Sequence, residues 1–578
     1  MAHEMTNAAV AATLHLLADL LAIRDESPYK VLAYRRAAES IAGLAEPLEA
    51  IRQRGALEAI PGVGAEIARK IGSLLDTGTF PLLQEVEAEI PPGVAALLAV
   101  PGIGPKRARA LYQRLGSDSL DALRAALAQG RLGAAGVGPR EAERLAAALR
   151  SLQATDARLP LAVARALGLE IIRALRDRVP AIRRIDLAGS IRRMRETIGD
   201  LDIVAAVEDP APAVAAFAAL PSVARVEMRG PTRCRVVLQN DFPADLWALP
   251  QRHWGSLLHH VTGNKYHDIR LRDLALARGA SLSEYGFTVG DQLVPCATEE
   301  EVYAFLGLQY IPPTMRENTG EIDLARQGQL PAVLTLAAVR GDLHVHTDWS
   351  DGTRGVRDMA RAARDRGYAY VCITDHSRGL GIAHGLDAAR LRAQRAEIDR
   401  VNAELAPFRV LQGVEVEVRD GGSLALADDA LAALDLVVAA VHSGLQQERG
   451  TLTARAVAAL RHPLVDVLAH PTGRILGGRA GGEVDMETLY AEAARTGTAL
   501  EIDGDPRRLD LRDVHARAAI TTGCTVAVDS DAHAVEGLEN MFYGVGVAQR
   551  AWTSPDRVLN ALSLDALLAR RKRHRPAT

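Results

Sequence analysis

The stretch LAGSIRRMRETIGDLDIV, residues 187–204, decides how the first part of the chain is interpreted. Near its end, Asp200 and Asp202 stand two positions apart in an apolar run that is typical of a β-strand. Side chains at this spacing on a strand point to the same face. There, two carboxylates can jointly hold a hard cation such as Mg²⁺, which binds a few carboxylates together with the phosphate oxygens of a substrate. The pair therefore predicts a metal site on one face of a strand.

A turn that suits phosphate precedes these two carboxylates. Gly189 and Ser190 let backbone N–H groups approach a triphosphate, and Arg193 can donate charge-assisted hydrogen bonds to it. The simpler interpretation is an ordinary strand that carries solvated acids. Several separate features in one short span favour a nucleotide site instead.

The stretch resembles the G-S-x-R-R-x-x-E-x-x-G-D-x-D signature of the family X DNA polymerases within the nucleotidyltransferases. The matching residues are Gly189, Ser190, Arg192, Arg193, Glu196, Gly199, Asp200 and Asp202. The resemblance implies a third catalytic carboxylate on a neighbouring strand, at Asp245 in FPADLWAL. It implies that the three carboxylates hold Mg²⁺ or Mn²⁺. It also implies nucleotide contacts by Gly189, Ser190 and Arg193, and by Arg158 just upstream.

Composition limits the class of protein. The 578 residues suggest about three to five structural units, and 48% hydrophobic with 24% charged residues is typical of globular domains. The 4 cysteines are far apart and form no Cys-x-x-Cys pair, which indicates a reducing compartment and no thiolate zinc site. No apolar run reaches the roughly 18 residues of a membrane span, and the N-terminus lacks the basic region of a signal peptide. We therefore expect a cytoplasmic protein.

Charge is distributed unevenly along the chain. The net charge of −4 argues against a general polyanion binder. Residues 101–200, however, carry 19 Lys and Arg against 10 Asp and Glu. This local surplus indicates where a nucleic-acid backbone would lie.

Three short turns in the first 150 residues share the pattern of a helix-hairpin-helix. They are IPGVG at 60–64, VPGIG at 100–104, and a weaker copy, GVG, at 136–138. The glycines expose N–H groups at the start of the following helix, which suits a DNA phosphate. A single turn of this kind is more often a plain helix cap, but three at a spacing of about 35–40 residues predict DNA binding. The candidate DNA contacts are Gly62, Gly64, Gly102, Gly104 and Lys106.

The N-terminal region is similar to the small lyase domain of family X polymerases and the DNA-binding subdomain beside it. In lyase-active members, a lysine after the first hairpin forms a Schiff base with the deoxyribose of an abasic site. Lys70 is the matching position, and Lys30 and Tyr34 match residues that assist. Such a lysine needs a lowered pKa to present a free amine, which a neighbouring cation such as Arg69 can supply. A phosphate contact or a plain surface lysine explains Lys70 equally well.

The run HHVTGNKYHD, residues 259–268, resembles the Y-F-T-G-S/N-K-x-H-N run of the family's nucleotide-selecting thumb. The resemblance implies nucleotide contacts by Thr262, Gly263 and Lys265. His260 and Val261 replace the aromatic pair that packs under the incoming sugar and helps to exclude ribonucleotides. We therefore expect weaker sugar discrimination than is usual in the family.

From residue 341 the pattern changes to strands that alternate with helices. Seven strands are expected, at GDLHVH, YAYVCITD, RVLQGVEV, LDLVVAAVH, VDVLAH, TALEID and TVAVDSD, which predicts a parallel α/β barrel. Side chains that bind metals cluster at or just after the carboxyl ends of these strands, where such barrels build their active sites. They are His344, His346, Asp351, His376, Glu415, His442, His470, Asp531 and His533. One such histidine is more often structural, but this number at one edge predicts a metal centre.

These motifs resemble the polymerase-and-histidinol-phosphatase (PHP) family, in HVHTDWSDG, TDHS, GVEVE, AVHSG, LAHP and DSDAH. The resemblance implies that all nine residues ligate two or three metal ions. Mixed imidazole and carboxylate ligands suit Mn²⁺, Zn²⁺ or Fe²⁺ rather than Mg²⁺, and such a centre can hydrolyse a phosphoester. The resemblance further implies a Mn²⁺-dependent 3′→5′ exonuclease, with cleavage at abasic sites or of 3′-phosphates as related activities.

Together the patterns predict a multidomain chain of the α+β and α/β classes. It should contain a helical helix-hairpin-helix region, a nucleotidyltransferase palm and thumb, and a distorted (β/α)7 PHP barrel. The expected parts are a lyase-like domain (1–80), a DNA-binding subdomain (81–157), a palm (158–250), a thumb (251–320), a linker (321–340), the PHP domain (341–570) and a basic tail (571–578).

This order resembles a bacterial family X DNA polymerase with a C-terminal PHP domain. It implies a repair polymerase that fills short gaps, acts on gapped or primer-template DNA with dNTPs, and works as a monomer at the nucleoid. Two alternatives remain. One is a small-molecule phosphatase joined to a nucleotidyltransferase, against which the hairpins count. The other is a non-enzymatic scaffold for DNA ends, against which the complete ligand sets count.

Overall fold

The computed structural model describes residues 5, 7–42, 44, 46, 48–100, 102–138, 141–142, 145–146, 149, 158–379 and 384–571. These form two compact units. The first comprises residues up to 158 with the short segments 221–225 and 236–243, and the second comprises the rest. Most of the helix expected after the third hairpin, and the basic tail from residue 572, lie outside the described residues. No helix of the described chain is long and apolar enough to cross a membrane.

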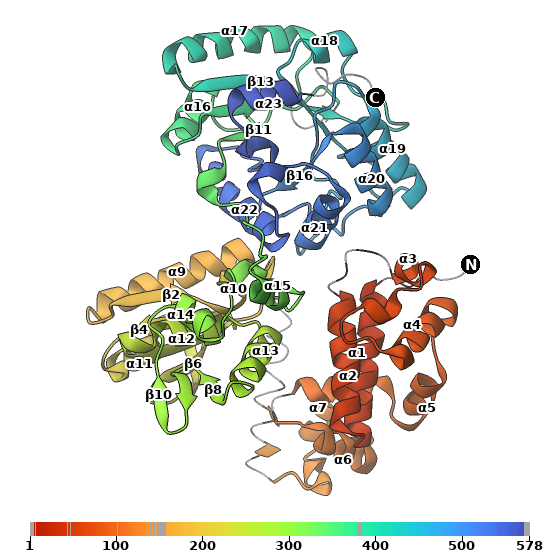
Figure 1. Ribbon diagram of the computed structural model, residues 1–578, viewed down its shortest axis with the longest axis vertical. Helices are drawn as coiled ribbons and strands as arrows, with labels where there is room; N and C mark the ends of the chain where they lie inside the picture. The colour runs from red at the N-terminus through yellow and green to blue at the C-terminus, as the bar shows by residue number, and fades with distance from the viewer. Residues whose placement is uncertain are drawn as a thin grey trace. The chain divides into compact units, whose positions relative to one another are not determined.

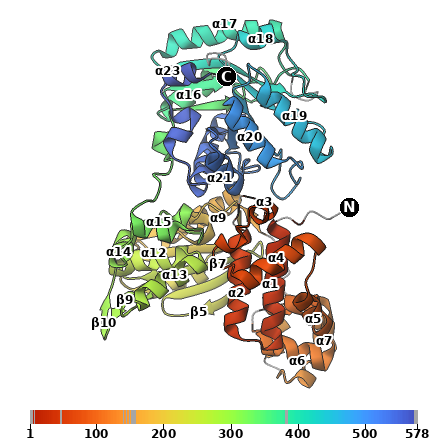
Figure 2. The ribbon, with the colours of Figure 1, turned by 45° about the vertical axis from the view of Figure 1, so that its right-hand side comes forward.

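The first unit is helical up to residue 158. Its helices are α1 (Asn7–Arg24), α2 (Pro28–Ala42), α3 (Leu48–Gln53), α4 (Ala65–Thr77), α5 (Pro81–Glu89), α6 (Pro105–Leu115) and α7 (Leu120–Ala128). Helices α1 and α2 lie side by side (Figures 1 and 2). Because α1 also contacts α5 and α6, one hydrophobic core extends from Val10 to Leu149. The expected lyase-like and DNA-binding regions therefore share a core.

The palm is a five-stranded sheet with the strand order β2-β4-β7-β6-β5. The strands are β2 (Arg184–Leu187), β4 (Leu201–Ala206), β5 (Val223–Arg229), β6 (Arg233–Leu238) and β7 (Pro243–Leu249). Helix α9 (Leu161–Arg178) precedes the sheet in the chain. Strands β4 and β7 are parallel neighbours, and their register places Asp202 directly opposite Asp245. Short elements complete the palm: β1 (Leu159–Pro160), α10 (Gly189–Arg192), β3 (Thr197–Ile198) and α11 (Pro210–Ala218).

The thumb combines helices with a small sheet that the sequence did not reveal. Its helices are α12 (Trp254–Thr262), α13 (Lys265–Leu276) and α14 (Glu299–Phe305). The antiparallel sheet consists of β8 (Ala280–Ser283), β9 (Gly286–Val289) and β10 (Gln292–Val294). The expected linker begins with a further helix, α15 (Glu321–Gln327), whose Ile322 and Ala325 are buried in the thumb core.

The C-terminal part is the predicted parallel barrel of seven strands in sequential order. They are β11 (Gly341–Val345), β12 (Tyr370–Ile373), β13 (Arg409–Glu417), β14 (Leu436–Ala440), β15 (Val467–Leu468), β16 (Ala499–Asp503) and β17 (Val526–Asp529). The barrel is nearly closed, because a parallel bridge pairs Val345 with Ala532 and the Leu343 N–H donates to Asp529.

Helices surround the barrel strands (Figure 1). They are α16 (Val356–Asp365), α17 (Ala388–Leu405), α18 (Asp428–Ala432), α19 (Arg449–Arg461), α20 (Met486–Thr496), α21 (Asp513–Thr522), α22 (Met541–Arg550) and α23 (Leu564–Arg570). The strands are buried on both faces, which explains their nearly continuous apolar sequences.

Candidate active sites

The palm sheet brings its three predicted carboxylates together. Oxygen atoms of Asp200, Asp202 and Asp245 lie within 4.8 Å of one another. Asp202 and Asp245 face each other on the parallel strands β4 and β7, and Asp200 directly precedes β4. The parallel pairing of two distant segments therefore builds the cluster that the sequence predicted.

Gly189 is required at this site for two structural reasons. Its φ of +58° lies in the left-handed region that side chains rarely adopt. In addition, a Cβ atom added there would lie 1.9 Å from the Asp202 Oδ2 atom. The backbone of the Gly-Ser turn thus approaches the carboxylate cluster as closely as the absence of a side chain permits.

The charges of the cluster favour a cation. Burial and the adjacent Asp200 and Asp245 carboxylates raise the pKa of Asp202 to about 8. Asp245 is partly compensated by two arginines of β6, because Arg233 Nη2 lies 2.9 Å from its Oδ1 and Arg235 Nη1 lies 3.0 Å from its Oδ2. Three carboxylates that repel one another in a partly desolvated site are the donor set that Mg²⁺ or Mn²⁺ binds. These residues therefore fit a divalent ion.

The two arginines of the signature have different partners. Arg192 forms a two-pronged ion pair with Glu299 of the thumb, with distances of 2.8 and 2.6 Å, and it also donates to the Thr262 hydroxyl at 2.8 Å. Arg193 donates to the Thr262 carbonyl and, at 3.2 Å, to Glu317. Arg193 is therefore placed next to the thumb turn that carries the other predicted nucleotide contacts. Arg158 is exposed, and its contact with a triphosphate stays a prediction.

The predicted thumb contacts stand at the junction of α12 and α13. Thr262 is the buried last residue of α12, Gly263 follows with φ +69°, and Lys265 is the exposed first residue of α13. The Asn264 side chain caps α13 by accepting from two backbone N–H groups. The positive end of the α13 helix dipole and the Lys265 ammonium are suited to an anion.

His260 stands where the family has the first residue of its aromatic pair. The His260 ring lies edge-on to Trp247 of β7, with 5.8 Å between the ring centres. Its Nδ1 lies 3.2 Å from a guanidinium nitrogen of Arg272 on α13. His260 is therefore held between the palm sheet and α13.

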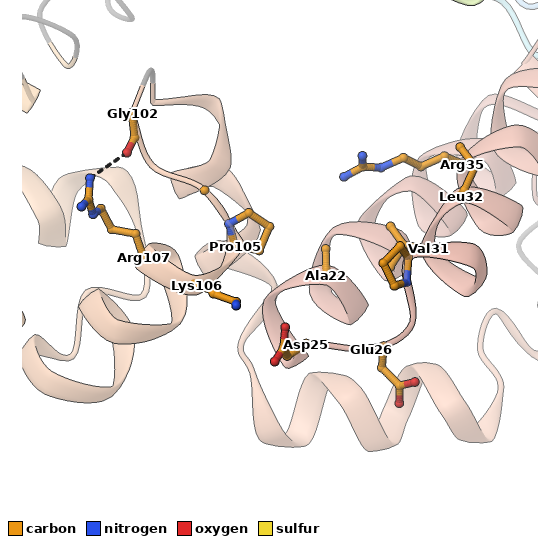
Figure 3. Close-up of a pocket in the computed structure, with 12 residues that line it drawn as sticks. Ala22, Asp25, Glu26, Val31, Leu32, Arg35, Gly102, Pro105, Lys106 and Arg107 are labelled. Carbon is orange, nitrogen blue, oxygen red and sulfur yellow. Dashed lines mark hydrogen bonds between the residues drawn. The ribbon is translucent and has the colours of Figure 1, made fainter. Parts of the chain in front are cut away.

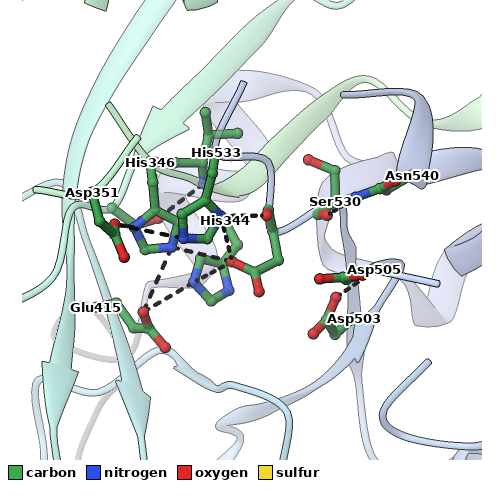
Figure 4. A network of polar contacts seen from close by, with 12 residues as sticks. His344, His346, Asp351, Glu415, Asp503, Asp505, Ser530, His533 and Asn540 are labelled. Atoms are coloured by element: carbon green, nitrogen blue, oxygen red, sulfur yellow. Dashed lines mark hydrogen bonds and ion pairs between the residues drawn. The ribbon is translucent and has the colours of Figure 1, made fainter. Parts of the chain in front are cut away.

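All nine predicted ligands of the barrel meet at or just after the carboxyl ends of the strands. Figure 4 labels His344, His346, Asp351, Glu415 and His533 among them. Three overlapping groups have ligand atoms within 4.8 Å of one another. They are His346, Asp351, His376 and His533; His344, His346 and Asp531; and His376, Glu415 and His442. His470 joins them through its Nε2, which lies 2.9 Å from Glu415 Oε1.

The charges of this cluster also suit metal ions. Although burial opposes protonation, Glu415 raises the pKa of His376 to about 10 and that of His442 to about 9. By contrast, burial and the neighbouring rings of His533 and His376 lower the pKa of His346 to about 3. His346 Nε2 lies 3.2 Å from Asp531 Oδ1, and the neutral imidazole offers one nitrogen lone pair to a metal. Cations can take the place of the protons beside Glu415 and bind to such a lone pair.

Two glutamates that orient the barrel ligands were not predicted. Glu501 of β16 lies 2.6 Å from His344 Nδ1, and Glu417 of β13 lies 2.6 Å from His442 Nδ1. A carboxylate at Nδ1 directs Nε2 toward a metal and fixes the ring. Glu417 stands two residues after Glu415 on the same strand, and this spacing could have indicated its role from the sequence. The role of Glu501 depends on barrel closure, and no local sequence pattern indicates it.

The first two hairpins have the geometry expected of phosphate-binding turns. Gly62 and Gly102 have φ angles of +82° and +91°, and Gly64 and Gly104 cap α4 and α6. A pocket of about 950 Å³ opens beside the second hairpin, with Lys106 and Arg35 on opposite walls (Figure 3).

Lys70 lies on α4, behind the first hairpin. Its ammonium donates to the Tyr34 hydroxyl and to Glu66. Partial burial lowers the pKa of Lys70, but these two partners offset it and hold the pKa above its ordinary value. The lowering of the Lys70 pKa by neighbouring cations, which the sequence led us to expect, is therefore not observed.

Comparisons with known proteins agree with this architecture. Family models match at residues 5–80 (helix-hairpin-helix domain), 94–151 (SAM-like helix-hairpin-helix tandem), 257–317 (DNA polymerase beta thumb) and 342–496 (PHP domain). A rat DNA polymerase lambda is 25% identical over 54% of this chain and 56% of its own length. A probable phosphatase of Syntrophotalea carbinolica is 25% identical over 38% of this chain and 90% of its own length.

One relative covers both chains almost completely. The Bacillus subtilis protein named DNA polymerase/3′-5′ exonuclease PolX is 36% identical over 566 residues, which are 97% of this chain and 98% of that protein. The similarity thus includes the hairpin region, the palm, the thumb and the barrel in one order. The chain belongs to the bacterial family X DNA polymerases that carry a C-terminal PHP domain.

Proposed function

We propose that this protein fills short gaps in DNA during repair. It is a DNA polymerase whose palm transfers nucleotides and whose PHP barrel is a 3′→5′ exonuclease, as its 36% identical relative is named. The observation that carries the proposal is the presence of two chemically different ligand clusters. One consists of three carboxylates on a palm sheet, and the other is rich in imidazole at the end of a barrel.

In the palm, Asp200, Asp202 and Asp245 would hold Mg²⁺ or Mn²⁺. Such ions, when bound, supply positive charge for the attacking and leaving oxygens of nucleotidyl transfer. The backbone at Gly189 and Ser190 would lie against the triphosphate. The close packing of Gly189 against Asp202 supports this role.

Arg193 and the turn from Thr262 to Lys265 would bind the triphosphate from the thumb side. The hydrogen bond from Arg193 to the Thr262 carbonyl joins the two groups into one surface. Cations and helix N-termini stabilise charge on phosphate oxygens. The primer 3′-hydroxyl then attacks the α-phosphate, and pyrophosphate leaves.

In the barrel, the nine clustered residues would hold two or three ions, with Mn²⁺, Zn²⁺ or Fe²⁺ preferred because imidazole predominates. Glu417 and Glu501 hold the His442 and His344 rings in the orientation that presents Nε2. Hydrolysis of the terminal phosphodiester releases a nucleoside monophosphate and shortens the primer by one nucleotide.

The DNA partner would be a gapped or primer-template duplex. The hairpins at Gly62–Gly64 and Gly102–Gly104 with Lys106 support it, because their turns present N–H groups and an ammonium. A DNA substrate in turn favours a cytoplasmic location at the nucleoid. We propose that the protein acts as a monomer.

A gapped duplex with a labelled primer tests this function. The protein is incubated with and without dNTPs, in Mg²⁺ and in Mn²⁺. We expect primer extension with dNTPs, and shortening from the 3′ end without them in Mn²⁺. The rival function, a phosphatase for small molecules, predicts hydrolysis of histidinol phosphate and no change in the primer length.

A further inference from the structure

A short loop of the palm connects the polymerase signature to the barrel. It comprises residues 193–196, between α10 and β3. Arg550, the last residue of α22 in the barrel, donates from Nη1 to the Arg193 carbonyl at 2.8 Å. The Glu196 carboxylate lies 2.9 Å from Arg474, which follows the barrel strand β15. Both ends of the loop are therefore bound to arginines of the barrel.

Glu317 connects the same loop to the thumb turn. Its Oε1 accepts from Arg193 Nε at 3.2 Å and from Arg550 Nη1 at 2.8 Å. Its Oε2 accepts from the side chain of Asn264 at 3.0 Å. Asn264 lies within the turn that contains Thr262, Gly263 and Lys265. One carboxylate thus joins the palm signature, the thumb turn and the barrel.

Arg550 is itself held by the barrel. Its Nε and Nη2 donate to Asp513 at 2.8 and 2.6 Å, and Asp513 is the first residue of α21. This leaves Nη1 for Glu317 and the Arg193 carbonyl. A planar guanidinium can serve partners on two sides in this way, whereas an ammonium cannot fix the same directions.

The loop is also seated by packing. Met194 has a left-handed φ of +55°, and its side chain covers Gly546 of α22. A Cβ atom added to Gly546 would lie 2.3 Å from the Met194 Cε and 3.0 Å from its Cγ. Gly546 therefore provides the space that Met194 occupies.

The charges in this contact are largely removed from water. The side chains of Arg550, Arg193 and Glu317 are 5%, 14% and 19% exposed. Burial alone would raise the pKa of Glu317, but Arg550 and Arg193 lower it to about 2, so the Glu317 carboxylate stays ionised. Removal of one partner from such a buried network leaves the other charges uncompensated. Each of these three charges therefore depends on its partners staying in place.

From these contacts we infer that Glu317 and Arg550 are positioning residues for nucleotidyl transfer. They hold Arg193 and the Thr262–Lys265 turn in one fixed arrangement, so that the PHP barrel is a structural part of the nucleotide-binding end of the polymerase site. The inference rests on the nucleotide-binding roles proposed above for Arg193 and the turn.

Steady-state extension of a gapped duplex by the full chain tests it, with dNTP concentration varied and exonuclease activity measured on the same preparation. We expect Glu317→Gln and Arg550→Gln each to raise the KM for dNTP about tenfold, with kcat and exonuclease activity within about twofold. Arg550→Lys should give an intermediate KM. Arg517→Gln is the matched control, because Arg517 is a barrel arginine that contacts Thr319 and Trp552 instead of the loop.

The outcomes distinguish the positioning role of Glu317 and Arg550 from the proposed nucleotide contact of Arg193. If Arg193→Gln raises the KM but neither Glu317→Gln nor Arg550→Gln does, the positioning role is wrong. If Arg193→Gln leaves the KM unchanged, the proposed nucleotide contact itself is wrong. A fall in kcat at constant KM, equal in the Arg517→Gln control, would show a merely structural contact and overturn the inference. Should Arg550→Gln fail to fold, the isosteric Glu317→Gln decides.

Discussion

Gly189 is the residue at which the palm site leaves least room for change. The substitution Gly189→Ala would place a Cβ atom 1.9 Å from Asp202 Oδ2 and force the carboxylate or the turn to move. Because displacements of about 1 Å at a reacting centre cost about a hundredfold in rate, we expect kcat for extension to fall by at least that factor. Exonuclease activity should not change.

The chain provides a matched control for that substitution. Gly290, between β9 and β10, has the same φ of +58°, but no atom lies within 4 Å of an added Cβ. Gly290→Ala therefore carries the backbone strain without the collision, at a cost of about 1–2 kcal/mol. If both variants extend a primer equally well, the contact with Asp202 is not what makes Gly189 necessary.

At Lys70, the surroundings predict a pH dependence. The nucleophile of a Schiff base is the free amine, which appears as the pH rises through the pKa in the folded protein. Glu66 and Tyr34 hold that pKa high, so borohydride trapping on abasic-site DNA should increase toward alkaline pH. Glu66→Gln removes the anion that raises the pKa of Lys70 and should shift the rising limb of the profile to lower pH.

Two variants limit the interpretation of this experiment. Exposed Glu58→Gln should leave the trapping profile in place, and Lys70→Ala should abolish trapping. Trapping that survives Lys70→Ala would assign the amine to another lysine, with Lys30 the first candidate. An unshifted profile in Glu66→Gln would show that Glu66 does not set the reactivity of the amine.

At the scale of single elements, the last turn of α12 bears on sugar selection. His260 is held against Trp247 and Arg272 where the family has an aromatic residue. We expect weaker rejection of ribonucleotides than is usual, measured as the ratio of kcat/KM for dCTP to that for rCTP. Replacing His260 and Val261 together by Tyr and Phe should raise this ratio about tenfold. A preference for dCTP of many thousandfold in the unaltered chain would mean that another group excludes the 2′-hydroxyl.

Strand β16 supports the metal centre through Glu501. One Glu501 oxygen lies 2.6 Å from His344 Nδ1, and the other accepts from the backbone N–H of His470 at 2.7 Å. Glu501 therefore supports two of the predicted ligands. Glu501→Gln should raise the Mn²⁺ concentration for half-maximal exonuclease activity about 10–100-fold and spare extension. Exposed Glu483→Gln is the control. An unchanged Mn²⁺ requirement would deny Glu501 this role.

The elements also show why some features could be predicted and others could not. The barrel strands and their ligands have strong local signals, because apolar runs and metal-type residues adjoin in the sequence. The strands β8, β9 and β10 have 3 or 4 residues each, too few to establish a period. The roles of Glu501 and Glu317 arise from contacts between segments distant in the chain, which no local pattern contains.

At the scale of the whole molecule, the two metal centres should be chemically separable. The palm centre is built from carboxylates and should accept Mg²⁺. The barrel centre is rich in imidazole, so Mg²⁺ should support it poorly and Mn²⁺ well. Asp202→Ala removes a palm ligand and should reduce primer extension by at least about a hundredfold. Digestion of the primer by Asp202→Ala should continue at the normal rate, because the barrel ligands remain.

The reciprocal change removes a barrel ligand. His344→Ala, on the first barrel strand, should abolish primer digestion and spare extension. Because bound metals can stabilise the strand ends, circular dichroism must accompany this variant. His442→Ala tests the same centre from the fourth strand. If a well-folded His344→Ala protein still digests the primer normally, the barrel cluster is not the nuclease. If Asp202→Ala stops digestion as well, both reactions depend on one site, and the barrel has only a supporting role.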